Sequence, residues 1–175
     1  MGRIRKMANE IRTWYKFRFL FPWAKHKGFV RIMHGVSFAK GIDIQMGHHV
    51  QLGRYCDVTT STHFGNYVLL GAWVSIVGRQ DHVYHEPEKT IWEGGRGKSD
   101  LTVIEDDVWI GAQTIIMSGI TIGRGSIVAA GSVVTHDIPP CEIWGGYPAR
   151  KLKDRFSSEE DLQKHLRYLD RLTTS

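Results

Sequence analysis

The feature that most constrains this chain is a six-residue period that runs through its middle. An aliphatic or aromatic residue opens each block of six, and the openers are Met46, Leu52, Val58, Phe64, Leu70 and Ile76, then Ile104, Ile110, Ile116, Ile122, Val128 and Val134. A period of six fits neither an α-helix, which repeats every 3.6 residues, nor one long strand, which repeats every two. It predicts a short strand followed by a corner, repeated many times.

Stacking such coils would align the openers in columns, and we expect these columns to form the core. The fifth residue is small or apolar as well, from Val50 to Val74 in the first run and from Val108 to Ile138 in the second. Glycine follows the opener at positions 47, 53, 65, 71, 111 and 123. We expect these glycines at corners where a Cβ would clash or where φ must be positive. The Asp-Ile-Pro-Pro stretch at 137–140 is expected to end the solenoid, because proline cannot donate a ladder hydrogen bond.

The two runs of blocks are out of phase. Ile76 and Ile104 lie 28 positions apart (104 − 76), which is not a multiple of six. Something must leave the coil between them, and the segment 77–103 carries Pro87, glycines and mixed charge, which is typical of a long loop. Long loops that leave a rigid scaffold are often functional. This loop brings two histidines, His82 and His85, together with two acidic residues.

The second run, VWIGAQTIIMSGITIGRGSIVAAGSVVTHDIPPCEIWGGYPARKLK, resembles the hexapeptide-repeat acyltransferases, and the likeness covers about residues 30–155. The resemblance implies a left-handed parallel β-helix, a homotrimer, and acetyl-CoA bound in grooves between subunits. The basic, aromatic start and the short length are most similar to the O-acetyltransferases of polysaccharide biosynthesis. We therefore divide the chain into an N-terminal segment 1–30, a β-helix domain 31–155 with its loop 77–103, and a C-terminal helix 156–175.

Acetyl transfer to a hydroxyl needs one proton removed from the attacking oxygen, and histidine suits that task because it titrates near neutrality. Family members place a histidine at the base of such a loop, so the resemblance implies His82 as the general base. Asp81, His85 and Glu86 are candidates for a supporting role; both carboxylates could equally be solvated loop residues.

The resemblance also implies the residues that hold the coenzyme. The acetyl-CoA-binding residues carried over are Ala112, Ala130, Thr135, His136, Arg150 and Lys153. Two of them depart from the family pattern, because His136 stands where lysine is usual and Lys153 stands where arginine can occur. Histidine is largely neutral at pH 7, and lysine offers a phosphate a point charge rather than a two-pronged contact.

These observations predict an acetyl-CoA-dependent O-acetyltransferase that acts on a hydroxyl of a sugar or polysaccharide precursor. Acetylation of an amino sugar at nitrogen is the alternative within the same chemistry. Two other readings stay open: a zinc enzyme similar to γ-type carbonic anhydrases, with His82 and His85 as ligands, and an inactive β-helix scaffold. The expected cofactor is acetyl-CoA, with no metal.

The N-terminal segment holds most of the positive charge. Residues 1–31 contain nine Lys or Arg and one acid, or +8, so the remaining 14 basic and 17 acidic residues sum to −3. The body is therefore not expected to bind nucleic acid. Apolar residues at helical spacing among these cations predict a helix that either caps the open end of the β-helix or, through residues 1–23, contacts an anionic membrane.

The sequence has no apolar run long enough to span a bilayer and no signal-peptide pattern at its start. Cys56 and Cys141 form no motif, which is typical of a reducing compartment. We therefore expect a cytoplasmic protein, placed at the inner face of the membrane if the N-terminal segment binds lipid. Residues 157–172 predict a helix, with a Ser157–Glu160 capping box, that packs on the coil or on a neighbouring subunit.

Overall fold

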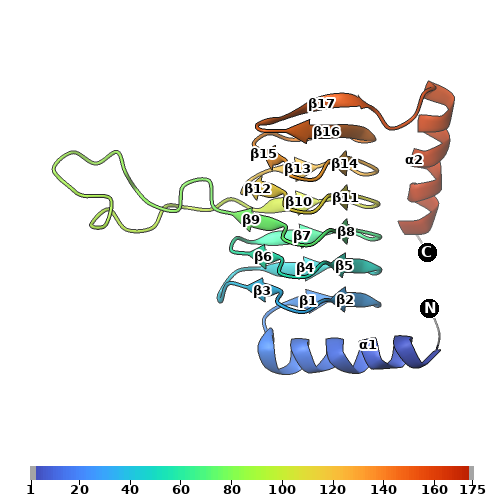
Figure 1. Cartoon of the computed structure of the whole chain (residues 1–175), viewed down its shortest axis with the longest axis horizontal. Coiled ribbons are helices and arrows are strands. Elements are labelled where there is room, and N and C mark those ends of the chain that lie inside the picture. The colour runs from blue at the N-terminus through green and yellow to red at the C-terminus, as the bar shows by residue number, and fades with distance from the viewer. Residues whose placement is uncertain (1–2, 174–175) are drawn as a thin grey trace.

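The chain winds into a left-handed parallel β-helix of about six coils, with one helix across its first coil and another along its side (Figure 1). The structure, a computed structural model, describes residues 3–173, and it describes the side chains of residues 7–172. Each coil contributes one short strand to each of three parallel sheets. The fold class expected from the six-residue period and the family resemblance is confirmed.

The elements are short, as the period requires. The helices are α1 (Arg3–Tyr15), the π-helical turn η1 (Lys16–Leu20) and α2 (Glu159–Thr173). The strands are β1 (Lys25–His26), β2 (Val30–Ile32), β3 (Ser37–Phe38), β4 (Ile44–Met46), β5 (Val50–Leu52), β6 (Asp57–Val58), β7 (Thr62–Phe64), β8 (Leu69–Leu70), β9 (Ser75–Val77), β10 (Thr102–Ile104), β11 (Trp109–Ile110), β12 (Ile115–Met117), β13 (Thr121–Ile122), β14 (Ile127–Val128), β15 (Val133–Val134), β16 (Glu142–Gly146) and β17 (Ala149–Asp154).

Three sheets form the walls of the solenoid. Sheet A is ordered β1-β4-β7-β10-β13, sheet B is ordered β17-β16-β14-β11-β8-β5-β2, and sheet C is ordered β15-β12-β9-β6-β3. Their strands pair in parallel except β17, which returns antiparallel to β16. The chain passes from sheet A to B to C in each coil, so three corners, A–B, B–C and C–A, separate the walls.

The twelve openers occupy the interior, as expected. All of them are buried, and the strand register stacks them in three columns, for example Leu52 beside Leu70 in sheet B and Ile76 beside Ile116 in sheet C. The fifth residues of the blocks are buried too, including Thr114 and Ser132. Thr114 donates its hydroxyl to the carbonyl of Gly111, which satisfies a polar group inside the core.

The glycines after the openers allow neighbouring coils to pack closely, and their own φ angles are not positive. A Cβ on Gly53 would lie 2.2 Å from the carbonyl oxygen of Gly71 in the next coil. The left-handed residue instead comes three positions after the opener and is often not glycine, as at Tyr55 (φ 59°) and Trp73 (φ 63°). Of the two roles expected for these glycines, only close approach applies. Since the corner places an aromatic side chain outside the coil at Tyr55 and Trp73, the two rings stack with centroids 4.4 Å apart.

The predicted loop is real, with slightly different bounds. Stacked residues are normally 18 positions apart, as for Asp57 and Ser75, but Ser75 and Ile115 are 40 apart, so the insertion adds 22 residues (40 − 18). It runs between Val77 at the end of β9 and Thr102 at the start of β10, and therefore covers residues 78–101.

The solenoid begins earlier and ends later than the sequence predicted. Strand β1, at residues 25–26, already pairs with β4, so the first coil starts inside the segment 1–30. At the other end, Pro139 and Pro140 do not stop the stack, because they lie in the turn before β16, which pairs in parallel with β14. The hairpin of β16 and β17 closes this end (Figure 1).

Helix α1 caps the first coil through polar side chains. The side-chain amide of Asn9 and the hydroxyl of Thr13 donate to the carbonyl oxygen of Val30, at 3.1 and 3.0 Å. The ammonium of Lys16 reaches the carbonyls of Ile32 and Met33, at 3.1 and 2.7 Å. These carbonyls belong to or directly follow β2, the edge strand of sheet B, so α1 satisfies an edge that would otherwise be open. The capping role expected for this segment is present in the structure.

Helix α2 packs on the A–B corner of its own chain. Of the two positions expected for it, on the coil or on a neighbouring subunit, the structure shows packing on the coil. The carboxylate of Asp107 accepts hydrogen bonds from Arg155 and from His165 of α2, at 2.6 and 2.9 Å. The helix is capped one residue later than predicted, by Ser158, whose hydroxyl accepts the backbone N–H of Asp161 at 3.1 Å. Within residues 3–173, no helix combines the length and the apolar character needed to cross a bilayer.

Candidate active site at the base of the inserted loop

The inserted loop leaves the solenoid at the C–A corner and projects from it as an arm (Figure 1). Its two sides pair near the base, where the N–H of Gly97 donates to the carbonyl of Asp81 at 3.3 Å and that of Val83 donates to Gly95 at 3.1 Å. Nearly all of the arm is exposed, and the Trp92 side chain is 91% exposed. An isolated chain therefore leaves large apolar side chains of the arm in water.

His82, the predicted base, lies between those two cross-arm hydrogen bonds and is exposed. Asp81 precedes it and turns back toward Gly78, where an added Cβ would lie 1.9 Å from a carboxylate oxygen of Asp81. Glu86 forms an ion pair with Lys89 at 2.5 Å, and the ring of His85 meets Tyr84 edge-on at 5.8 Å. The structure thus places the four candidate residues on one stretch of the arm, with His82 nearest the solenoid together with Asp81.

Arg79, which the sequence reasoning did not single out, anchors the base of the arm. Its backbone N–H donates to the hydroxyl of Ser118 at 3.0 Å, and its guanidinium donates to the carbonyl oxygen of Thr135 at 2.8 Å. Ser118 lies one coil above Arg79 and Thr135 two coils above. The position could have been found from the period, because Arg79 stands three residues after the opener Ile76, at the corner position.

The coenzyme residues implied by the resemblance fall in two groups, one at the corner before the strands of sheet C and one at the corner after them. Thr135 and His136 follow β15 at the C–A corner, where the Thr135 hydroxyl and Nδ1 of His136 lie 2.9 Å apart. Arg79 ties the arm to this same corner. The arm that carries His82 therefore starts at the C–A corner, where Thr135 and His136 also lie.

The second group lies at the B–C corner. Ala112 and Ala130 each stand two residues after an opener there, in successive coils. The terminal hairpin packs beside them, since the N–H of Ala129 donates to the carbonyl of Trp144 at 2.8 Å. Arg150 pairs with Gly145 in this hairpin and Lys153 pairs with Ile143, and both basic residues are exposed.

Sheet C therefore separates the two groups within one chain. A ligand that contacts both must lie across this wall or occupy a groove to which two subunits each give one edge.

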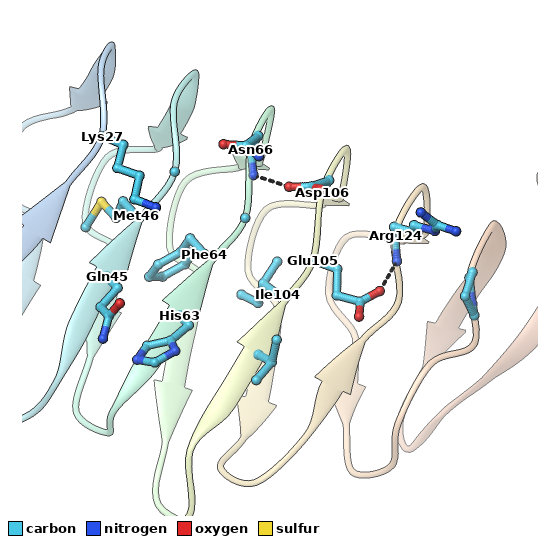
Figure 2. A pocket seen from close by; sticks show the side chains of 14 residues that line it. Lys27, Gln45, Met46, His63, Phe64, Asn66, Ile104, Glu105, Asp106 and Arg124 are labelled. Atoms are coloured by element: carbon cyan, nitrogen blue, oxygen red, sulfur yellow. Dashed lines mark hydrogen bonds between the residues drawn. The ribbon is translucent and has the colours of Figure 1, made fainter. Parts of the chain in front are cut away.

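A separate groove of 680 Å³ crosses the outer face of sheet A (Figure 2). It is hollow because Gly47 and Gly65 follow their openers without a side chain, and Lys27, His63 and Arg124 line it. Nε2 of His63 lies 2.7 Å from a carboxylate oxygen of Asp43, and this hydrogen bond, with a second from Gln45, holds the pKa of Asp43 below its usual value. None of the sequence-predicted site residues lines this groove.

The part of the chain that the structure describes holds no group of three or more His, Cys, Asp or Glu placed to bind a metal ion. His48 and His49 lie side by side with their Nδ1 atoms 2.9 Å apart, and both rings pack on Tyr67.

Part of the repeat matches a known family model. Residues 101–136 match the family model described as bacterial transferase hexapeptide (six repeats). Over this segment the chain is similar to the hexapeptide-repeat transferases. The matched segment covers β10 to β15 and includes Ala112, Ala130 and Thr135.

Two curated relatives show the same likeness over more of the chain. The galactoside O-acetyltransferase of Escherichia coli (strain K12) is 31% identical over 137 residues, which are 77% of this chain and 64% of that protein. A chloramphenicol acetyltransferase of Klebsiella aerogenes is 36% identical over 110 residues, which are 55% of this chain and 52% of that protein. The chain thus spans about half of the second relative and less than two thirds of the first.

Among solved structures, a hexapeptide-repeat-containing acetyltransferase of Vibrio cholerae complexed with acetyl coenzyme A is similar, with a TM-score of 0.57 and 27% identity. The likeness covers 85% of this chain and 79% of that one.

Proposed function

We propose that this hexapeptide-repeat protein is an acetyl-CoA-dependent O-acetyltransferase that acts on a hydroxyl of a sugar or polysaccharide precursor. The observation that carries the proposal is the anchoring of the arm by Arg79, which holds His82 at the same corner as Thr135 and His136. The relatives support it, because their names give acetyl transfer to a galactoside hydroxyl and to chloramphenicol.

His82 would act as the general base. Its imidazole takes the proton of the acceptor hydroxyl as that oxygen attacks the thioester carbonyl, and a tetrahedral oxyanion forms. Collapse of this intermediate breaks the carbon–sulfur bond. The imidazolium then returns its proton to the departing thiolate, so the products are the acetyl ester and free CoA. No covalent enzyme intermediate is required, because the acceptor attacks directly.

The coenzyme would lie along sheet C. Backbone groups at Ala112 and Ala130 would contact its amide-bearing arm, while Arg150 and Lys153 on the exposed hairpin would meet its phosphates. Thr135 and His136 would hold the thioester end near His82.

A homotrimer completes this site. The arm extends away from its own solenoid, and its Trp92 and Ile91 side chains are exposed in the single chain. Trp73 at the B–C corner and Trp109 in β11 are exposed as well. A neighbouring subunit would cover such surfaces and would give each coenzyme groove its second wall. Light scattering should give three times the chain mass of 20.0 kDa; a fully active monomer would contradict the shared groove.

The experiment that tests the activity is acetyl transfer from radiolabelled acetyl-CoA to a panel of acceptors. The panel should contain simple sugars, amino sugars, nucleotide sugars and lipid-linked sugars. We expect an alkali-labile ester on a hydroxyl. An alkali-stable amide on an amino sugar would instead establish N-acetylation, and no transfer to any acceptor, together with no binding of CoA, would contradict the proposal.

A further inference from the structure

Over residues 7–15, helix α1 carries its apolar side chains on the face that points away from the solenoid. Among the described side chains of α1, at residues 7–15, the buried ones are polar: Asn9 and Thr13, which hold the edge of sheet B. The side chains of Ile11 and Trp14 are each 61% exposed. A helix that only caps a β-helix would turn its apolar stripe toward the core. This helix does the reverse, so its apolar face is left for another surface.

The exposed face continues into η1 as an aromatic cluster. Trp14 meets Phe19 edge-on with centroids 5.8 Å apart, and Tyr15 lies 5.2 Å from the same ring. The guanidinium of Arg18 lies over Phe19 at 5.4 Å. Phe19 is 56% exposed and Leu20 beside it is 48% exposed. The cluster is therefore formed and ordered, yet it has no cover within the described part of the chain.

The charge around this face is positive. Arg12 and Arg18 are exposed on α1 and η1, and Glu10 is the single acidic residue between positions 7 and 20. Tryptophan and tyrosine prefer the boundary between hydrocarbon and water, and arginine pairs with lipid phosphate. An apolar face with aromatic side chains and surrounding cations fits the headgroup region of an anionic bilayer better than a purely apolar partner.

The position of the helix allows such contact. In Figure 1 α1 lies across the end of the stack, opposite the β16–β17 hairpin, and away from the projecting arm. The outer face of α1 thus forms one end of the molecule, and a planar surface could meet it without obstruction by the solenoid. In a trimer whose axis runs parallel to the solenoid, three such helices would lie at the same end.

We propose that the outer face of α1 and η1, formed by Met7, Ile11, Trp14, Tyr15, Phe19 and Leu20 with Arg12 and Arg18, docks on the surface of an anionic lipid bilayer. The inner polar face would keep capping the solenoid at the same time, so docking needs no refolding. Docking is independent of the acetyl-transfer proposal, since it rests on a different end of the molecule.

The test is co-sedimentation of the full-length protein with vesicles of phosphatidylcholine alone or with 30% phosphatidylglycerol (about one lipid in three, an ordinary anionic fraction). We expect binding to the anionic vesicles at low salt, weaker binding at high salt, and little binding to the neutral vesicles. The double variant Arg12→Glu and Arg18→Glu should lose at least about tenfold in affinity for the vesicles, because each cation near an anionic surface strengthens binding. The matched control, Lys164→Glu and Arg167→Glu on α2, makes the same charge change and should bind as the wild type does.

A second pair of variants tests the apolar contribution. Trp14→Ala with Phe19→Ala should weaken the binding that remains at high salt, whereas Trp92→Ala on the arm should not. Melting temperature must be measured for each variant; the outer-face variants leave Asn9, Thr13 and Lys16 in place and should stay folded. Two results would overturn the proposal: no binding of the wild type to anionic vesicles at low salt, or equal binding by the outer-face variants and their controls. If Trp14→Ala with Phe19→Ala lowers the oligomer mass while the wild type ignores vesicles, the face binds a second copy instead.

Discussion

The guanidinium of Arg79 donates a 2.8 Å hydrogen bond to the carbonyl oxygen of Thr135, across 56 positions of the chain. Arg79 is the second residue of the inserted arm, and Thr135 follows β15 two coils away. The bond fixes the base of a long, exposed loop to the corner that carries the predicted thioester-binding residues. It ties Arg79, three positions before His82, to Thr135, although His82 itself belongs to a segment with few contacts.

Replacing Arg79 with alanine should lower turnover without loss of the fold. The arm would keep its cross-arm hydrogen bonds but would no longer be held against Thr135, and misplacement of a base by about 1 Å can cost about 100-fold in rate. We expect kcat to fall while KM for acetyl-CoA changes little. Arg79→Lys should recover part of the rate, since a lysine can still donate one hydrogen bond. Arg167→Ala, an exposed change on α2, is the control; equal kcat for Arg79→Ala and this control would remove Arg79 from any positioning role.

Gly53→Ala should destabilise the solenoid. Its Cβ would lie 2.2 Å from the carbonyl oxygen of Gly71, and backbone of the next coil cannot easily move aside. We expect the free energy of unfolding to fall by about 1–3 kcal/mol, the usual cost of overpacking. Urea unfolding followed by circular dichroism measures it. Gly41→Asn is the matched control, because nothing lies within 4 Å of its added Cβ and asparagine tolerates a φ of 80°. A smaller loss at Gly53 than at Gly41 would contradict the close-approach explanation.

The inner and outer faces of α1 should respond differently to mutation. Thr13→Val keeps the shape of the side chain but removes the hydroxyl that donates to Val30, which should cost about 1 kcal/mol of unfolding free energy. Ile11→Thr on the outer face should cost little, because that side chain is 61% exposed. Urea midpoints of the two variants provide the comparison. The capping account is wrong if Ile11→Thr proves the more damaging change.

The Asp43–His63 pair predicts a pH effect at the sheet A groove. The hydrogen bond from His63 lowers the pKa of Asp43 from its ordinary 3.8. A carboxyl group with a lowered pKa in the folded state contributes stability above its ordinary pKa and loses it as the pH falls through the lowered value. His63→Ala should therefore raise the pKa of Asp43 toward 3.8 and reduce the acid dependence of stability below that pH. Carboxyl-carbon NMR titration reads the pKa directly, with His49→Ala as the control; an unmoved Asp43 pKa in His63→Ala would show that the hydrogen bond is absent in solution.

The coil architecture could be predicted because one short rule governs it. Each opener such as Ile110 must be apolar to enter the column, and each glycine such as Gly53 must be small to let the next coil approach. The same rule located the inserted loop, since a 22-residue insertion breaks the phase. Handedness came only with the family resemblance, because a period of six says nothing about chirality.

Other features depended on contacts between distant segments and could not be read from the period. Arg79 binds Thr135 across two coils. Helix α1 turns Asn9 and Thr13 inward, because the carbonyl oxygen of Val30 in the edge strand would otherwise lack a hydrogen-bond donor. The prolines at 139–140 misled the prediction of where the solenoid ends, since they lie in a corner where no ladder N–H is needed. The separation of Ala130 from Thr135 by a whole sheet became visible only once the walls were assembled.

The central claim, that His82 is the general base of an acetyltransferase, is tested most directly by comparing His82→Ala with wild type in two measurements. These are kcat for transfer from acetyl-CoA to the best acceptor of the panel, and the Kd for CoA from calorimetry. The account predicts that kcat falls by about 10²–10⁴ while Kd stays nearly unchanged, because a general base acts on the proton and not on coenzyme binding. His85→Ala should be much milder. Full kcat in His82→Ala, or a greater loss in His85→Ala, would contradict the account.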